Sequence, residues 1–590
     1  MEPGRLLFKF SLLITRRIIA KSQELPEYLW NCPANRIASD MGRSFSWSRL
    51  LALAGALFVA GLTAFAYRPA WHGGFIWDDD RYVTNNPLLI MPDGLRRIWF
   101  SLDAPSQYFP LSYSLLRVER FLWDLNSAGY HWVNILLHVA NALLVWRVLG
   151  RLAIPGSWLA ASIFALHPIQ VESVAWISEV KNLLMAFFFL LTLLTWVEYL
   201  DRRDQRWPLL YIVALVFYFL ALAAKSTACT LPAALVLILW WKKRPIGRRA
   251  IVQIVPFLVL ALSAGLIAVW WEKYHQGTRI LVSLAPLERV LIASRAFWFY
   301  LSKIFWPSNL TFIYPQWKID VSNVTGYCWL AATAALIVLI YFARRFFGRG
   351  IEVALLFFVA TLAPVLGFIM LYTFRYSFVA DHYQYLACIG PIALASAGFV
   401  KSADNLGNAR WIAWAGAFAA IACLSALTFR QSATYRDMET LWRSTIAKDP
   451  GSWMAYNNLG VVEFDKGNID DAISKYERSL ELHPEYPEAL YNLGTALLQK
   501  GRVEDAIRLC EEALKLQPSD VDAHVVLGNA LMAKQDVDGA INHYRAALNL
   551  RPNDSNAHHN LGVALQQQGQ GEEAAREFKQ AGESSPKRNP

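Results

Sequence analysis

The stretch NLLMAFFFLLTLLTWVEYL, residues 182–200, contains a single charged side chain and is long enough to cross a lipid bilayer. Residues 50–67 and 251–271 are similar apolar runs. Hydrophobic residues make up 55% of the 590-residue chain, a share that soluble domains rarely sustain over such a length. Because these residues are gathered into long runs rather than spread periodically, the sequence predicts a polytopic membrane protein.

Counting the apolar runs predicts about eleven transmembrane helices. They lie at approximately 48–68, 131–149, 153–168, 182–200, 207–224, 227–241, 250–271, 324–343, 351–371, 385–400 and 410–430. Segment 286–306 is left out of the count because it carries four charged side chains among aromatic residues. That pattern favours a helix lying at the membrane interface.

The formal net charge of +10 sits largely in short clusters between apolar runs, at 202–206, 242–249 and 344–349. Short loops rich in Lys and Arg are typical of the cytoplasmic side, so this distribution argues against nucleic-acid binding. With a basic N-terminal extension (1–47) inside, alternation places four loops of the membrane domain (48–430), and everything after residue 430, outside. The four outward loops are 69–130, 167–181, 272–323 and 372–384.

The six cysteines form no close pair such as CxxC, and four of them lie in apolar spans. They are Cys32, Cys229, Cys328, Cys388, Cys423 and Cys510. The sequence therefore predicts neither a disulfide framework nor a metal site, and buried thiols acting as small apolar groups are expected. No tightly bound cofactor is expected, and a need for a divalent metal is left open.

A strict 34-residue period begins after residue 430, in a more polar and helical composition. It is carried by prolines, glycines, alanines and bulkier residues: Pro450, Pro484, Pro518, Pro552 and Pro586; Gly460, Gly494, Gly528 and Gly562; Ala472, Ala506, Ala540 and Ala574; Tyr476, Cys510, Tyr544 and Phe578. This resembles the tetratricopeptide repeat (TPR), in which small residues lie where two helices touch and a bulky one fills the groove. An all-α chain is expected, with a connecting half-repeat (431–451) and four repeats (452–587) that form an α-solenoid able to bind extended partners.

The first outward loop contains FIWDDDRYVTNNP, residues 75–87, with three consecutive acids beyond a membrane span. Clustered carboxylates repel one another and raise at least one pKa, which suits a general base. Asp78 and Asp79 are therefore candidates for catalysis. The alternative is a hydrated loop that caps a helix, since Asp is a favoured N-cap residue.

The second outward segment, HPIQVESVAWISEVKN (167–182), places ionisable groups at the end of a span. His167 and Glu172 are candidates to line a cavity, or are interfacial residues wetted by headgroups. Lys181 is a candidate to bind a phosphate, or an anchor of the span at the interface.

The third segment, RYSFVADHYQYL (375–386), brings Arg375, Asp381 and His382 to the mouth of a span. A phosphate clamp and a structural Arg–Asp pair fit this segment equally well. A fourth segment, WPSNLTFIYP (306–315), is aromatic and holds no acid, base or cation suited to the chemistry.

These four segments, in this order and ahead of the repeats, resemble the transmembrane and tetratricopeptide-repeat-containing O-mannosyltransferases and their bacterial relatives. Those proteins belong to the membrane glycosyltransferases of the C superfamily, and the resemblance covers roughly residues 48–586. It rests first on Asp78-Asp79 followed by Asn86-Pro87. The segments 172–176 and 306–315 match next best.

The resemblance implies an outward cavity in which a sugar, expected to be mannose, passes from a polyprenyl phosphate to a protein hydroxyl with inversion. It implies Asp78 as the general base, with Asp79 orienting it or binding the acceptor. Lys181 and Arg375 are the candidates to hold the donor phosphate. Membrane lipids, the lipid-linked donor and an acceptor polypeptide are the expected partners.

Two segments depart from the bacterial relatives. Those tend to have Arg-Lys-Asp where this chain has Val180-Lys181-Asn182, and Arg where it has His382. If those cations hold the lipid phosphate, Lys181 must do more of this work here.

The repeats resemble those of O-GlcNAc transferase in one respect. Asn458, Asn492 and Asn560 each lie two residues before the repeat glycine, as in an asparagine ladder that grips a peptide backbone, while Val526 interrupts the series. Asn is also a common polar choice at an exposed helix position, and that alternative stays open. The repeats are expected on the periplasmic side of a bacterial inner membrane, or in the lumen of the endoplasmic reticulum in a eukaryote.

Two rival functions remain at this point. The first is transfer of the sugar to a lipid or a glycan, with the repeats organising partners. The second is a non-catalytic membrane scaffold whose repeats recruit other proteins.

Overall fold

The computed structural model describes residues 47–101, 107–202, 207–275, 284–369 and 372–584. Within these ranges the chain consists of helices and turns, without a strand, which confirms the all-α prediction. The chain divides into two units, residues 1–57 and 58–590; the candidate site, the cavity and the repeats described below lie in the second. Cys32 and nearly all of the extension 1–47 lie outside the described residues. The five cysteines that are described are free thiols.

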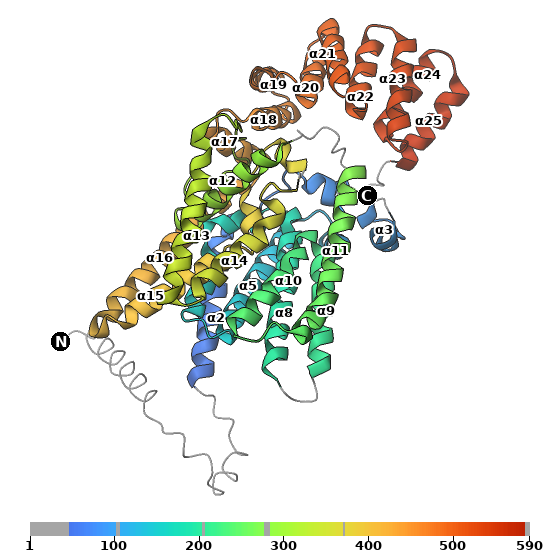
Figure 1. The fold of residues 1–590 in the computed structure, drawn as a ribbon. Coiled ribbons are helices and arrows are strands. Elements are labelled where there is room, and N and C mark those ends of the chain that lie inside the picture. Colours follow the sequence, from blue (N-terminus) through green and yellow to red (C-terminus); the bar gives the residue numbers. More distant parts are fainter. Residues whose placement is uncertain (1–46, 102–106, 203–206, 276–283, 370–371, 585–590) are drawn as a thin grey trace, which may run out of the picture. The chain divides into compact units, whose positions relative to one another are not determined.

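Each of the eleven predicted spans contains an α-helix, and the helices from α2 to α16 are called here the membrane domain (Figure 1). These eleven are α2 (Trp47–Ala66), α5 (Ser127–Arg151), α6 (Ser157–Leu166), α8 (Val180–Asp201), α9 (Trp207–Ala224), α10 (Leu231–Trp241), α11 (Arg248–His275), α13 (Cys328–Phe347), α14 (Gly350–Leu362), α15 (Ile389–Asp404) and α16 (Arg410–Ser432). By length and composition, the described residues contain six helices able to cross a bilayer: α2, α5, α8, α11, α13 and α16. The helices α6, α10 and α14 are too short on their own for a bilayer about 30 Å thick; short 3₁₀ turns extend α10 and α14.

Aromatic side chains and paired polar groups hold the membrane domain together. Trp196 of α8 and Tyr218 of α9 both pack against Phe257 of α11, with ring centroids 5.8 and 5.6 Å apart. Polar groups inside the bundle need partners because lipid supplies none. Two polar side chains of α5, His138 and Asn141, accordingly lie 2.7 and 3.1 Å from one hydroxyl, that of Tyr385.

The segment predicted to lie at the interface forms the helix α12 (Pro286–Phe305), which is not among the six long apolar helices. Its charged side chains contact protein groups. The Arg295 guanidinium lies 4.3 Å from the ring centroid of Trp317, and Arg289 donates to the carbonyl of Phe368 at 3.1 Å. The remaining helices of the membrane domain are short: α3 (Gly94–Phe100), α4 (Pro110–Trp123) and α7 (Val171–Ala175).

After the connector helix α17 (Met438–Lys448), four helix pairs follow one another as the period predicts (Figure 1). They are α18 (Trp453–Asp465), α19 (Ile469–Leu482), α20 (Pro487–Gln499), α21 (Val503–Leu516), α22 (Val521–Ala533), α23 (Val537–Leu550), α24 (Ser555–Gln567) and α25 (Gly571–Ser584). The repeat glycines meet the bulky residues as predicted. A Cβ atom on Gly528 would lie 2.5 Å from Cε1 of Tyr544, and one on Gly494 would lie 3.0 Å from Sγ of Cys510.

These contacts predict different costs for the same substitution. Gly528→Ala places a methyl group against the buried Tyr544 ring, and such overpacking costs about 1–3 kcal/mol. Gly494→Ala meets only a small thiol, so the roughly 1 kcal/mol that Ala gains over Gly in a helix should offset the crowding. Hydrogen exchange of the amides in each helix pair, measured on the full chain, should show faster exchange for α22 and α23 in Gly528→Ala. Equal protection in both variants would contradict this packing.

Candidate active site

The loop after α2 carries the acidic triplet and is tied down by Asp79. Asp79 is fully buried, and its two carboxylate oxygens accept hydrogen bonds from the backbone N–H groups of Ile76 and Ser178, both at 2.8 Å. The hydrogen bond from Ser178 to Asp79 links the second outward segment to the first. Burial raises the pKa of Asp79 to about 7, although these two bonds favour the charged form. Asp79 therefore fixes the position of the loop.

Asp78 is partly exposed, and its carboxylate accepts no hydrogen bond from any residue in the described ranges. Burial raises its pKa, the positive charges of Lys181 and Arg81 lower it, and Glu179 raises it again. Repulsion between the neighbouring carboxylates, the cause expected from the sequence, also raises the pKa of Asp79, but burial raises it more. Asp78 thus presents an acceptor atom beside a cation.

That cation is Lys181, in the first turn of α8. Its side chain is 7% exposed, its Nζ lies 2.9 Å from Oε1 of Glu179, and it sits 4.5 Å above the Tyr82 ring and 5.5 Å from the Trp176 ring. An ammonium group enclosed by aromatic faces and one carboxylate is not an interfacial anchor, which was the alternative for this residue.

A second lysine, missed by the sequence analysis, completes this charged cluster. Nζ of Lys225 lies 3.3 Å from Oε2 of Glu179 and donates to Oδ1 of Asn182 at 2.8 Å. A signal for it existed, because Lys225 is a lone charge between the apolar runs 207–224 and 227–241. The predicted alternation of spans places that connection outside, together with the candidate residues, and an ionisable residue in such a position is a default functional candidate.

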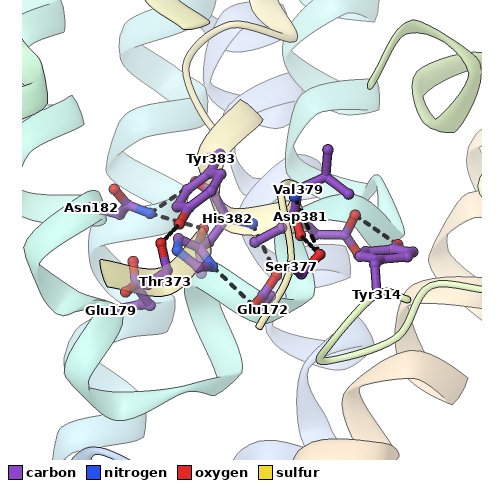
Figure 2. Close-up of polar contacts among 12 residues, drawn as sticks. Glu172, Glu179, Asn182, Tyr314, Thr373, Ser377, Val379, Asp381, His382 and Tyr383 are labelled. Carbon is purple, nitrogen blue, oxygen red and sulfur yellow. Dashed lines mark hydrogen bonds and ion pairs between the residues drawn. The ribbon is translucent and has the colours of Figure 1, made fainter. Parts of the chain in front are cut away.

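The second and third segments meet through Glu172 and His382 (Figure 2). Glu172 is buried, and its two oxygens lie 2.9 Å from Nδ1 and from the backbone N of His382. Asn182 donates to the His382 carbonyl at 2.9 Å. Glu172 is therefore not wetted by headgroups, and Asn182 and His382, two of the three residues that depart from the bacterial pattern, are in direct contact.

Asp381 contacts the fourth segment, because the Tyr314 hydroxyl lies 3.0 and 3.1 Å from its two oxygens (Figure 2). Burial raises the pKa of Asp381 well above its ordinary value, with a further contribution from the negative charge of Glu172. Tyr314 therefore takes part in the cluster although its segment held no suitable acid, base or cation.

Two predicted site residues lie apart from this cluster. His167 is buried, with Nε2 2.8 Å from the carbonyl of Ile304, and its Nδ1 accepts from the N–H of Ile169, so it caps a 3₁₀ turn. Arg375 lies 3.8 Å from Oε2 of Glu488 in the repeat helix α20. The structural pair considered for Arg375, with Asp381, is not found in the described part of the chain.

The three ladder asparagines are half-buried in the first helices of their repeats. Asn492 donates to Oδ1 of Asn457 at 3.0 Å, and Asn560 donates to Oδ1 of Asn529 at 2.9 Å. Asn458 donates to the carbonyl of Met454 within its own helix at 2.7 Å. Two of the three thus form asparagine pairs with the preceding repeat.

The connector helix α17 packs directly on the residue before Asp78. Trp442 is fully buried, and its ring centroid lies 5.2 Å from that of Trp77 and 5.5 Å from that of Phe312. The backbone N–H of Trp77, whose φ is +50°, points at the sulfur of Met438 at 3.1 Å. A non-glycine residue with positive φ needs such support from its surroundings.

The comparisons with known proteins follow this geometry. Models described as tetratricopeptide repeat and TPR repeat match residues 423–481, 462–521 and 528–569. The repeats are therefore TPR repeats. A Caenorhabditis elegans protein named protein O-mannosyl-transferase is 24% identical over 477 residues, covering 77% of this chain. Human protein O-mannosyl-transferase TMTC4 is 32% identical over 163 residues, 23% of this chain.

The chain is similar in sequence to these protein O-mannosyl-transferases. It spans 66% of the length of the worm O-mannosyl-transferase and 22% of the human one. Among solved structures, MamA covers 25% of this chain and 85% of its own at 27% identity, with a TM-score of 0.23. YrrB, described as a TPR protein with an unusual peptide-binding site, covers 25% and 77% at 23% identity, with a TM-score of 0.22.

Proposed function

We propose that this protein is a membrane-embedded, inverting transferase that moves mannose from a polyprenyl phosphate to Ser or Thr hydroxyls of a polypeptide. One observation carries the proposal: a partly exposed carboxylate with a free acceptor atom, Asp78, lies in the field of an enclosed ammonium group, Lys181. The homologues' names support mannose and a protein acceptor. The site would face outward, with the repeats on the same side.

The ammonium group makes Lys181 a suitable partner for the donor phosphate. Lys181 and Lys225 share the single carboxylate of Glu179, and Asp78 contributes a second negative charge that acts on Lys181. When Asp78 takes up the acceptor proton, that second charge is neutralised. The lipid phosphate is an anion of the right kind, and its contacts to an ammonium are charge-assisted.

The reaction then needs a base and a cation. Asp78 takes the proton of the acceptor hydroxyl as the oxygen attacks the anomeric carbon, and the bond from that carbon to the phosphate oxygen breaks. The phosphate leaves with the bonding electron pair, and Lys181 stabilises the charge that develops on it. Asp79 positions Asp78 through its two backbone hydrogen bonds.

The buried carboxylates Glu172 and Asp381 and the partly buried His382 shape the wall of this site. Glu172 holds His382 by its ring and its backbone, and Asp381 is held by Tyr314. The Trp176 ring lies 5.9 Å from the imidazole of His382 and 5.1 Å from the ring of Phe312. Such an aromatic and hydrogen-bonded frame keeps the reacting groups in place without reorganisation.

The TPR array would present the acceptor polypeptide. Arg375 bridges toward α20 through Glu488, and α17 contacts the Asp78 loop. The asparagine series Asn458, Asn492 and Asn560 would hold the backbone of the acceptor.

The acid limb of the pH–rate profile should reflect the pKa of Asp78. A base works in its deprotonated form, so turnover falls as the pH drops through its pKa. Because burial raises the pKa of Asp78 above 3.8, the loss should begin at a higher pH than an ordinary aspartate would give. The profile of kcat for mannose transfer, measured at saturating donor, checks this. An acid limb at the ordinary aspartate value would contradict the assignment.

The function itself is tested with the full chain in proteoliposomes and polyprenyl-phosphate-[³H]mannose. We expect label in protein that is released by alkaline β-elimination, and none from a sugar nucleotide alone. Label in lipid or glycan would favour the rival acceptor classes. Unchanged donor with every acceptor, while the repeats still bind peptide, would favour the scaffold.

A further inference from the structure

A large cavity lies away from the candidate site, among α5, α8, α10, α14 and α15. Its volume of about 1220 Å³ exceeds the roughly 300–1,000 Å³ of ordinary small-molecule sites. It is open on one side, and its deep wall is apolar, with Val145, Leu193 and Phe357 among the lining residues. On α8, Leu193 lies twelve residues beyond Lys181, about 18 Å along the helix axis at 1.5 Å per residue.

Small residues of α15 create this space. Gly390 approaches α14 so closely that a Cβ atom would lie 2.3 Å from the carbonyl oxygen of Ala354. Further along α15, the small residues Ala393, Ala397 and Gly398 line the cavity. A Cβ atom on Gly398 would meet nothing within 4 Å. The cavity is therefore a built feature of the helix packing.

The rim of the cavity is strongly basic. Five cations line it: Lys243, Arg344, Arg345, Arg349 and Lys401. One acid, Glu352, lines it as well. None of the five forms an ion pair with a carboxylate in the described ranges, whereas the neighbouring Lys242, which does not line the cavity, pairs with Asp201 at 2.7 Å.

The rim carries the residue types that are found at the level of lipid headgroups. Phe347 lines the cavity yet is 71% exposed, and Trp240 and Trp241 lie beside it. Trp241 donates its indole N–H to the carbonyl of Leu152 at 3.0 Å, and Arg349 donates to that of Trp240 at 3.1 Å. Aromatic and basic side chains together are typical of the membrane–water interface.

We propose that this cavity is a binding site for one anionic phospholipid of the inner leaflet. The acyl chains would fill the apolar depth, and the headgroup phosphate would lie among Arg344, Arg345 and Arg349. An apolar cavity ending in cations that form no ion pair with a described carboxylate complements this class of molecule, and the predicted cytoplasmic position of these basic loops faces the leaflet rich in anionic lipid. The site is independent of the proposed transferase activity.

The test uses the purified full chain and native mass spectrometry, with phosphatidylglycerol and phosphatidylcholine of identical chains as probes. The wild type should retain one phosphatidylglycerol in preference to phosphatidylcholine. The triple variant Arg344→Gln/Arg345→Gln/Arg349→Gln should lose affinity for phosphatidylglycerol on the order of a hundredfold, at about fivefold for each cation. Its matched control, Arg202→Gln/Arg248→Gln/Arg249→Gln, removes the same charge outside the cavity and should bind as the wild type does.

A second pair of variants tests the apolar part. Gly398→Trp places an indole on the cavity wall, where a Cβ atom meets nothing within 4 Å, and should lower retention of phosphatidylglycerol. Gly416→Trp, at a similarly open helical glycine of α16, should not. The proposal would be overturned if both triple variants lost the same affinity for phosphatidylglycerol, or if Gly398→Trp retained phosphatidylglycerol as the wild type does.

It would also be overturned if the protein retained polyprenyl phosphate more strongly than phosphatidylglycerol, or if glycerol phosphate alone displaced phosphatidylglycerol.

Discussion

Asp78→Asn should lower mannose transfer by about 10²–10⁴, the usual contribution of a general base. The change is nearly isosteric and removes a negative charge whose formation burial already disfavours, so folding should survive. No hydrogen bond to the Asp78 side chain is lost among the described residues, in contrast with Asp79. Turnover of polyprenyl-phosphate-mannose in proteoliposomes, with expression and thermal stability measured alongside, gives the result.

Asp80→Asn is the matched control for this prediction. Asp80 is exposed, and its carboxylate accepts from the Thr84 hydroxyl at 2.8 Å, so its loss should change turnover little. Asp79→Asn should behave differently again, because an amide can accept only one of the two backbone hydrogen bonds; we expect lower stability as well as lower activity. Full activity in Asp78→Asn would remove the catalytic role of this loop.

Lys181→Met should weaken donor binding about ten- to a hundredfold, because a charge-assisted contact to phosphate is worth roughly 1.5–3 kcal/mol. Arg375→Gln is the contrast, since the Arg375 guanidinium lies beside Glu488 and its loss should leave donor affinity nearly unchanged. Equilibrium binding of labelled polyprenyl-phosphate-mannose measures both. A larger loss of donor affinity in Arg375→Gln than in Lys181→Met would instead assign the phosphate-binding site to Arg375 in the third segment.

Lys181→Met also leaves the buried Glu179 carboxylate with one cation fewer to neutralise it, and this can lower the stability of the fold. The double variant Lys181→Met/Glu179→Gln removes that stranded charge. We expect it to regain stability without regaining donor binding. Recovery of donor binding in the double variant would assign Lys181 a structural role.

Period and composition predicted the fold well because both are local properties of the chain. The glycines at 34-residue steps lie against the bulky residues, as the contact of Gly528 with Tyr544 shows. Apolar runs marked the helices of the membrane domain, and charges within 286–306 separated α12 from the long apolar helices.

The site was predicted less completely because its contacts join distant segments. Asp78, Lys181 and His382 were candidates from their own surroundings, but Tyr314 gains its role only from Asp381, 67 residues away. Lys225 was a single lysine in an apolar stretch, and its importance becomes evident only when Glu179 is seen between two lysines. No local sequence pattern predicted that Arg375 would lie beside a helix of the repeats.

The contact of Trp442 and Met438 with Trp77 limits how the two halves of the protein can be exchanged. In a solenoid each repeat touches only its neighbours, so helix pairs added or removed after α19 leave the packing around Asp78 intact. The connector α17 cannot be exchanged in this way, because replacing it would remove the contacts that support Trp77, the residue before the proposed base Asp78. A chimera that carries a foreign repeat array should therefore keep residues 431–482 with the membrane domain, since α17 is also paired with α18 through Arg443 and Glu463. Acceptor choice can be altered by grafting beyond that junction.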